Sequence, residues 1–128
     1  MSALNRMQQI DTLLTHVWMV RTFLKHSDEA AEDDELREVH RVLYDYSLAL
    51  GKPYAENDAA TYLKQARKKL SKLQQATRLF LEIQPEISQH TNFLMAARSL
   101  RAAVEGVAAL LAETADDADT GNLGEQSS

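Results

Sequence analysis

The chain has 128 residues, of which 45% are hydrophobic and 26% are charged, and its formal net charge is −5. This length fits one domain with a single core, and this hydrophobic content excludes a disordered chain. The absence of cysteine excludes a disulfide framework, a thiolate zinc site and a thiol nucleophile, and the two prolines and four glycines are too few for a sheet protein.

The first predicted helix runs from Ala3 to about His26, because an arc of apolar residues covers one side of a helical wheel there. The arc is broader than a surface helix needs, so we expect this helix to touch neighbours on two sides. Met19 lies outside the arc, where a monomer would prefer a polar residue. The arc consists of Leu4, Met7, Ile10, Leu14, Val17, Trp18 and Leu24, flanked by Leu13, Val20 and Phe23.

The connection after this helix, residues 27–35, allows two interpretations. It contains no glycine or proline, and Ala30 and Ala31 suit a helix. Ser27, Asp28, Asp33 and Asp34 are all good capping residues and favour a turn instead. One long helix through this stretch would give an extended hairpin that needs a second subunit to cover its apolar stripe.

A second helix is predicted from about Asp34 to Leu50, where apolar residues recur at helical spacing. Gly51 and Pro53 are expected to end it, since a glycine followed by a proline is typical of a helix C-terminus. The predicted stripe consists of Leu36, Val39, Val42, Leu43, Tyr46 and Leu50.

The third predicted helix is capped by Asn57 or Asp58 and runs to about Gln84, where Pro85 is expected to break the pattern. Its stripe consists of Tyr62, Leu63, Ala66, Leu70, Leu73, Thr77, Phe80 and Leu81. A fourth helix is predicted from about Glu86 or Ser88 to Ala112. Its stripe consists of Ile87, Phe93, Leu94, Ala97, Leu100, Val104, Val107 and Leu111.

Four amphipathic segments with short connections imply antiparallel neighbours. We therefore predict an all-α protein, an up-down-up-down four-helix bundle over residues 1–112. The remainder, residues 113–128, reads ETADDADTGNLGEQSS and is predicted to be an acidic, disordered tail.

Three histidines offer a possible metal site. By the rise per residue, His16, His40 and His90 fall within about 20 Å of the same end of the bundle. With Glu86 one turn before His90, they could hold zinc or a di-iron pair. The chain lacks Glu-x-x-His and His-x-x-x-His, the paired spacings that bundle metal sites usually show. The favoured interpretation is therefore three partly buried histidines, bonded to neighbouring carbonyls or hydroxyls, and no cofactor.

The segment from Arg21 to His26, RTFLKH, has the spacing of the Arg-x4-His motif and in this resembles the HEPN-type ribonucleases. Those proteins are also small helical bundles, and the resemblance implies that the pair cleaves RNA at a dimer cleft. Here Thr22 follows Arg21, instead of the usual Asn, Asp or His. Arg21 also points into the apolar arc, where its stem is expected to pack while its guanidinium reaches a carboxylate or the bundle end.

The acidic run contains Glu29-Ala-Ala-Glu32, which resembles the first half of the MazG-type nucleotide pyrophosphatase motif. Carboxylates three residues apart share a helix face and can bind Mg²⁺. That family needs a second Glu-x-x-Asp on a following helix, and the one here, Glu113 to Asp116, falls in the predicted tail. The run is interpreted as a solvated turn whose acids favour the start of the second helix.

The third helix has a basic face opposite its stripe, which could meet an acidic partner, RNA, or residues 28–38 of another copy. No aromatic residue or glycine interleaves this face, and the net charge is acidic, so nucleic-acid binding is not expected. The face consists of Lys64, Arg67, Lys68, Ser71, Lys72, Gln75 and Arg78.

The leading prediction is a small non-catalytic interaction or scaffold protein that binds a protein partner or associates with itself. The N-terminus lacks a cationic start followed by a continuous apolar stretch, so we expect a cytoplasmic protein without membrane attachment. The alternative is an enzyme or metal binder that uses Arg21 with His26, or the three histidines with Glu86. The residues expected to contact a partner are Trp18, Met19 and Phe23 and, on the other side, Lys64, Lys68 and Lys72.

Overall fold

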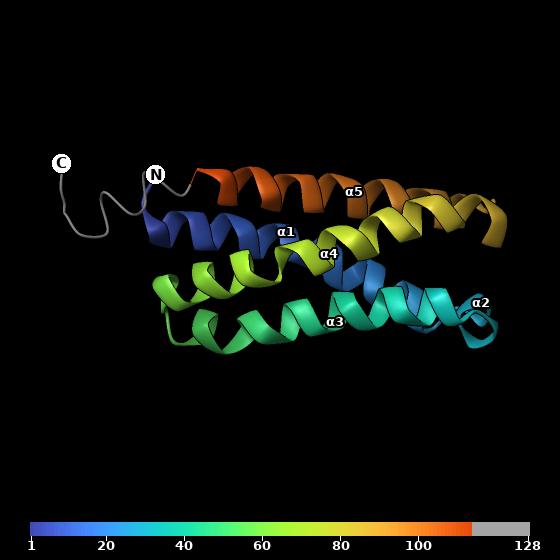
Figure 1. The fold of residues 1–128 in the computed structure, drawn as a ribbon, viewed down its shortest axis with the longest axis horizontal. Helices are drawn as coiled ribbons and strands as arrows, with labels where there is room; N and C mark the ends of the chain where they lie inside the picture. Colours follow the sequence, from blue (N-terminus) through green and yellow to red (C-terminus); the bar gives the residue numbers. More distant parts are fainter. Residues whose placement is uncertain (114–128) are drawn as a thin grey trace.

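The computed structural model describes residues 1–113, which form five α-helices and no strand. The helices are α1 (Ala3–Lys25), α2 (Asp28–Glu32), α3 (Asp34–Ala55), α4 (Ala59–Ile87) and α5 (Thr91–Ala112). The four long helices lie side by side, and the short α2 closes the end opposite the N-terminus (Figure 1). The predicted all-α bundle is confirmed. The predicted acidic tail lies, apart from Glu113, outside the described residues.

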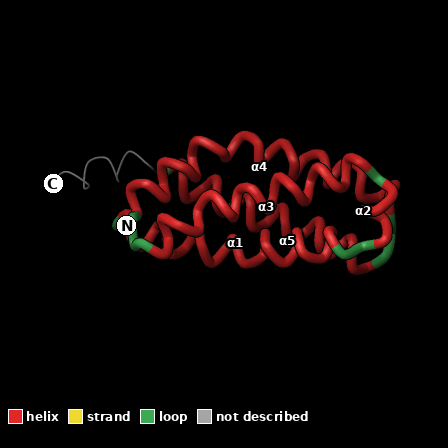
Figure 2. The backbone as a smooth tube through the Cα atoms, turned by 90° about the horizontal axis from the view of Figure 1, so that it is seen from below, coloured by secondary structure: helices red, strands yellow, loops and turns green. Residues whose placement is uncertain are grey.

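The long helices form a ring in which each packs against two neighbours. Helix α1 packs against α3 and α5, and α4 packs against the same two, while α1 and α4 face each other across the diagonal. In Figure 1, α1 and α4 run toward the end that carries α2, and α3 and α5 run back. The view along the perpendicular direction shows the same rods with their connections gathered at the two ends (Figure 2).

The core follows an alternating spacing of three and four residues along each helix. This seven-residue repeat is typical of helices that pack at small crossing angles in a left-handed supercoil. On α3 every seam position, meaning a position of this repeat that faces the core, is buried. These positions hold Leu36, Val39, Leu43, Tyr46, Leu50 and Pro53.

Three residues predicted for the core are instead exposed. Leu4 is 38% exposed, Trp18 40% and Leu94 45%. Each directly follows a seam position of its helix, held by Ala3, Val17 and Phe93 respectively. A wheel drawn at 100° per residue merges such neighbours into one arc, whereas the seven-residue repeat separates them.

Helix α3 does not end at Gly51, and this prediction is wrong. The helix continues to Ala55, and Pro53 is buried at a seam position in its last turn. A proline there removes a single backbone hydrogen bond, and its ring fills the core, so the loss is small. The chain turns at Asn57, whose φ of 57° lies in the left-handed region that asparagine tolerates. Asp58 then caps α4 as predicted, its Oδ1 accepting from the Thr61 N–H at 3.1 Å.

Pro85 does not break the pattern where the sequence predicted. Helix α4 continues to Ile87, with the exposed Pro85 in its last turn, and α5 begins only at Thr91. The buried Gln84 stabilises this end, because its Nε2 donates to the Ser88 carbonyl at 2.9 Å. Pro85 has no N–H to donate to the Leu81 carbonyl, and only two helical residues follow it, so the distortion that it causes is confined to the end of α4.

The connection between α1 and α3 is a turn that contains the short α2, so the single long helix is wrong. Ser27 Oγ accepts from the Ala30 N–H at 3.2 Å and caps α2, and Asp33 Oδ1 accepts from the Leu36 N–H at 2.8 Å and caps α3. Such caps stabilise a helix start by about 1 kcal/mol each. Arg37 joins the two helices, its Nη1 donating to the carbonyls of residues 30 and 31.

Candidate functional site

The groove between α1 and α3 holds an arginine packed against two aromatic rings. The Cζ of Arg21 lies 4.6 Å from the ring centroid of Trp18 and 4.7 Å from that of Tyr44, and the two centroids are 5.8 Å apart. The three groups therefore form a compact triangle, which we call the cationic notch. Each cation–π contact stabilises such a surface arrangement by about 0.5–1 kcal/mol.

The guanidinium of Arg21 has no counter-charge in residues 1–113. Its Nε is buried without a hydrogen-bond partner, and no ion pair of these residues includes it. Of the two partners predicted for this guanidinium, a carboxylate or the end of the bundle, the carboxylate is not found within residues 1–113. Because a buried donor is almost always bonded in a folded protein, the free edge of Arg21 needs an explanation.

Further positive charge surrounds the notch. Burial lowers the pKa of the half-buried His40, and the charges of Arg21, Arg41, Lys25 and Arg37 lower it further. Arg37 and Arg41 each pair with an acid three residues earlier on α3. Lys25, one turn after Arg21 on α1, has no ion pair in the described residues. The groove between α1 and α3 therefore carries an excess of positive charge in a protein whose net charge is −5.

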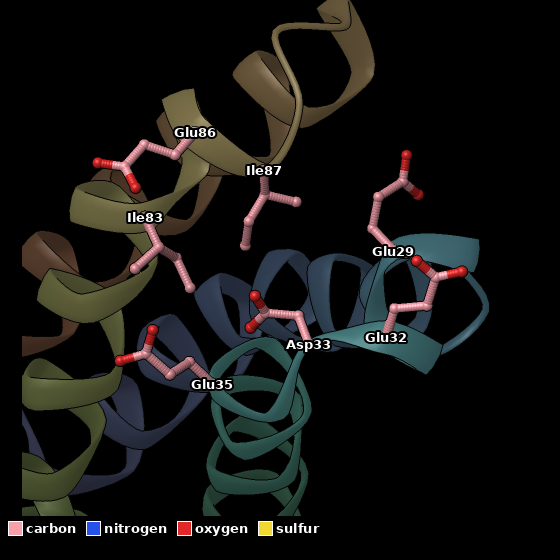
Figure 3. Close-up of a pocket in the computed structure, with 7 residues that line it drawn as sticks. All are labelled: Glu29, Glu32, Asp33, Glu35, Ile83, Glu86 and Ile87. Atoms are coloured by element: carbon pink, nitrogen blue, oxygen red, sulfur yellow. The ribbon is translucent and has the colours of Figure 1, made fainter.

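An acidic cavity lies at the end of the bundle that α2 closes. Its volume is about 340 Å³, and its walls come from α2, the start of α3 and the end of α4. Figure 3 shows carboxylates on both sides of this space, with Ile83 and Ile87 between them. We call it the acidic corner. Its residues are Glu29, Glu32, Asp33, Glu35, Ile83, Glu86 and Ile87.

The acidic corner also lacks a counter-charge. No ion pair within residues 1–113 includes Glu29, Glu32, Glu35 or Glu86. Asp33 differs from them, since it accepts the backbone N–H of Leu36 as a helix cap. The helix dipole favours acids at the start of a helix, and this accounts for Glu29 in α2 and Glu35 in α3. It does not account for Glu32 and Glu86, which lie at the ends of α2 and α4.

The histidines do not form the predicted alternative metal site. Within the described part of the chain, no group of three or more His, Asp or Glu side chains is placed to hold a metal ion. His16 is exposed on α1 and His90 is exposed at the start of α5, so the prediction that they are partly buried is wrong for these two. His90 instead caps α5, its Nδ1 accepting from the Asn92 N–H at 3.0 Å. His40 lies in the groove between α1 and α3, while Glu86 lines the acidic corner. The grouping of these four residues is wrong.

The two residues of the alternative catalytic pair, Arg21 and His26, lie in different surroundings. Arg21 packs against the rings of the cationic notch, whereas His26 is exposed at the C-cap of α1, where its backbone N–H donates to the Thr22 carbonyl at 3.2 Å. No hydrogen bond joins the two side chains in residues 1–113. Packing against Trp18 and Tyr44 thus gives Arg21 a setting that the Arg-x4-His spacing does not imply.

The basic face of α4 is exposed, as its sequence predicts, but acids from α3 interrupt it. Lys64 and Lys68 are open to solvent. Lys72 lines two shallow cavities between α3 and α4, and Glu38 lines both of them as well. The face is therefore a mixed-charge surface toward α3 and a purely basic one only near the start of α4.

The three apolar residues predicted to contact a partner differ in exposure. Met19 is 64% exposed. Trp18 is 40% exposed, and its ring packs against the other two residues of the notch, Arg21 and Tyr44. Phe23 is half-buried and packs edge-on against Phe93 of α5, with ring centroids 5.0 Å apart. Phe23 thus contributes to the packing of the bundle itself.

The sequence interpretation missed a fully buried arginine. Arg6 donates through Nη1 to the Leu110 carbonyl at 2.7 Å and pairs with Glu113 Oε1 at 3.3 Å. A cation there stabilises the last turn of α5, where carbonyls lack helical partners. Arg6, Leu13 and Val20 are spaced by seven residues and so lie on the same side of α1. This spacing could have predicted from the sequence that Arg6 is buried.

Two tyrosines tie the helices together through buried hydroxyls. Tyr62 donates to Asp11 Oδ1 at 2.9 Å, and Tyr46 donates to the Ala66 carbonyl at 2.9 Å. Burial raises the pKa of both hydroxyls, and the Asp11 carboxylate raises that of Tyr62 further. Both tyrosines therefore stay protonated and act as structural donors.

No family model, curated protein or solved structure matches the chain. Among residues 1–113, no helix combines the length and the hydropathy that a bilayer crossing requires. Two surface features in this part of the chain gather charge without its counter-charge, the cationic notch and the acidic corner.

Proposed function

We propose that the protein is a non-catalytic helical-bundle interaction protein that associates with a second copy of itself. What supports this is a set of large apolar side chains left outside a bundle whose seams are already filled. Trp18 and Met19 of α1 are exposed, and Leu48 of α3 is 62% exposed. Full burial of one such side chain stabilises a complex by about 1.5–3 kcal/mol.

These side chains belong to two helices that pack against each other, α1 and α3. Trp18 contacts Tyr44, and Leu48 follows Tyr44 by one turn of α3, so both helices contribute to the same face. Apolar groups gathered on a surface are typical of protein–protein contacts. Because most soluble assemblies are symmetric homo-oligomers, a second copy is the partner that this face fits best. We further propose that the protein acts in the cytoplasm.

Sedimentation analysis of the full chain over a wide range of concentration tests the proposal. We expect a mass that rises from one chain toward two with concentration. Leu48→Glu and Met19→Glu should each weaken the association at least about tenfold, because a carboxylate would replace buried apolar surface. Gln8→Glu, an exposed change of equal charge on α1, should leave it unchanged. A single-chain mass at every concentration would refute the proposal.

A further inference from the structure

The cationic notch holds its charge in a fixed orientation. Two rings pack against the guanidinium of Arg21 and its Nε is buried, so a ligand would bind through Nη1 and Nη2, for which no hydrogen bond is found within residues 1–113. A planar guanidinium presented edge-on matches a carboxylate, which can accept two parallel hydrogen bonds from it. Since the side chain is already ordered, binding costs little further conformational entropy.

The carboxylates that could occupy the notch are present in the same chain. The acidic corner offers Glu29, Glu32 and Glu35 without any cation in the described residues. No ion pair there joins the notch to the corner. The notch opens between α1 and α3, whereas the corner opens between α2, α3 and α4, so the two patches flank α3 on different sides.

We propose that the cationic notch of one copy binds the acidic corner of a second copy. The inference rests on the proposed self-association and names the charged contacts that orient it. Because each chain carries both patches beside the same helix, a two-fold pair can satisfy each notch with the partner's acids. The exposed Leu48 lies on the outer face of α3, one turn beyond Tyr44 on the side away from the acidic corner.

A second copy fits the notch better than a nucleic acid does. The acidic corner lies at the same end of the bundle, so its carboxylates would repel a phosphate backbone near the notch, whereas a second copy can turn its own cationic notch toward them. Acids of residues 114–128 are another source of carboxylates in the sequence. The experiment below separates that source from the corner by substitution.

A charge-swap experiment on the full chain tests the inference. Arg21→Glu with Lys25→Glu reverses the notch, and Glu32→Lys with Glu35→Lys reverses the corner. Each double variant alone should lose self-association by at least about tenfold, because like charges then meet at both contacts. An equimolar mixture of the two variants should recover the two-chain mass, with one chain of each kind seen by native mass spectrometry.

Single variants guard against misfolding at the packed Arg21. Lys25→Glu alone changes a fully solvated side chain and should still weaken association severalfold. Helical circular dichroism should be unchanged in every variant used. Lys64→Glu with Lys68→Glu, exposed on α4 and of equal charge change, is the matched control and should leave association intact. Wild-type association should also weaken as salt rises.

The outcomes separate this inference from the proposed function. If Leu48→Glu abolishes association while the notch and corner variants leave it intact, the charged contact is wrong and self-association stands. If the mixture of reversed variants stays single-chain, or if the α4 control weakens association equally, the inference also fails. Loss of association on changing Asp116, Asp117 and Asp119 to Asn would assign the notch to that segment instead. A wild-type protein that never associates would refute both.

Discussion

The two grooves that flank α1 are built in opposite ways. Toward α5 the contact is closed, because Arg6 bonds to Leu110 and Leu13 lies directly against Gly106. Toward α3 the contact is open at its outer edge, where Arg21 faces aromatic rings without a counter-charge. Helix α1 therefore carries Arg6, which bonds to a carbonyl and a carboxylate at the end of α5, and Arg21, for which residues 1–113 supply no ion pair.

Buried hydroxyls repeat the contrast. Thr22 Oγ1 on α1 and Ser47 Oγ on α3 are buried and have no hydrogen-bond partner. Unsatisfied polar atoms of this kind destabilise a fold by about 1–3 kcal/mol each. Both hydroxyls belong to α1 and α3, the two helices that also supply Arg21 and Tyr44. We therefore expect the contact of α1 with α5 to contribute more to stability, and the contact of α1 with α3 to be the one that a partner can bind.

The largest effect is expected at the closed groove. Arg6→Ala should lower the free energy of unfolding by about 3 kcal/mol, since it leaves a cavity and unpaired carbonyls at the end of α5. Urea denaturation followed by circular dichroism measures this change. Arg98→Ala, an exposed arginine of α5, serves as the control and should change stability little. An Arg6→Ala protein as stable as the wild type would contradict the contrast between the grooves.

The two helical glycines test the closeness of the packing. A Cβ at Gly51 of α3 would meet no atom within 4 Å, whereas one at Gly106 would lie 2.7 Å from Leu13 Cδ1. Gly51→Ala should raise the free energy of unfolding by about 0.5–1 kcal/mol, because alanine loses less entropy in a helix.

Gly106→Ala gains the same helix propensity but forces Leu13 to move. Its stability change should be at least about 1 kcal/mol less favourable than that of Gly51→Ala, as overpacking costs in this range. Thermal unfolding of the two variants side by side gives the difference directly. Equal stabilisation by both would show that the groove toward α5 has room to spare.

Much of the fold could be predicted from the sequence because seam residues recur at regular spacing. The helix caps could be predicted only as sets of candidates, which included the residues that cap the helices in the structure, Ser27, Asp33 and Asp58. The predicted helix ends at the two prolines were wrong, because α3 continues past Pro53 and α4 past Pro85. Whether a helix continues past a proline depends on the packing around it, which the local sequence does not specify.

The candidate site was harder to predict. The sequence placed Arg21 on the core side of α1, but its contact with Tyr44 depends on how α3 docks, which no local pattern specifies. The acids of α2 were noticed as a run, while Glu86 joins them from a distant helix. Long-range juxtaposition of this kind is a property of the tertiary structure alone.

Arg21→Met should change stability far less than Arg6→Ala does. Methionine keeps an apolar stem against Trp18 and Tyr44, and the loss of the cation–π contacts is offset by removal of the unbonded Nε. We expect a change within about 0.5 kcal/mol in the free energy of unfolding. The emission of Trp18, the single tryptophan, reports on the loss of the nearby cation. A loss as large as that of Arg6→Ala would make Arg21 a structural residue of the fold.

The smallest effect concerns pH and the half-buried His40. Its pKa is lowered below the usual 6.5 by burial and by positive neighbours, so the unfolded chain takes up this proton at a higher pH than the folded one. Stability contributed by neutral His40 is therefore complete above pH 6.5 and is lost as the pH falls through that value toward the lowered pKa. His40→Gln should reduce the fall in the free energy of unfolding between about pH 7.5 and pH 5.5, whereas His16→Gln, at an exposed site, should not. If a carboxylate occupies the notch in the associated protein, it offsets the positive neighbours and raises the pKa of His40, so the ring's NMR titration should move upward with protein concentration.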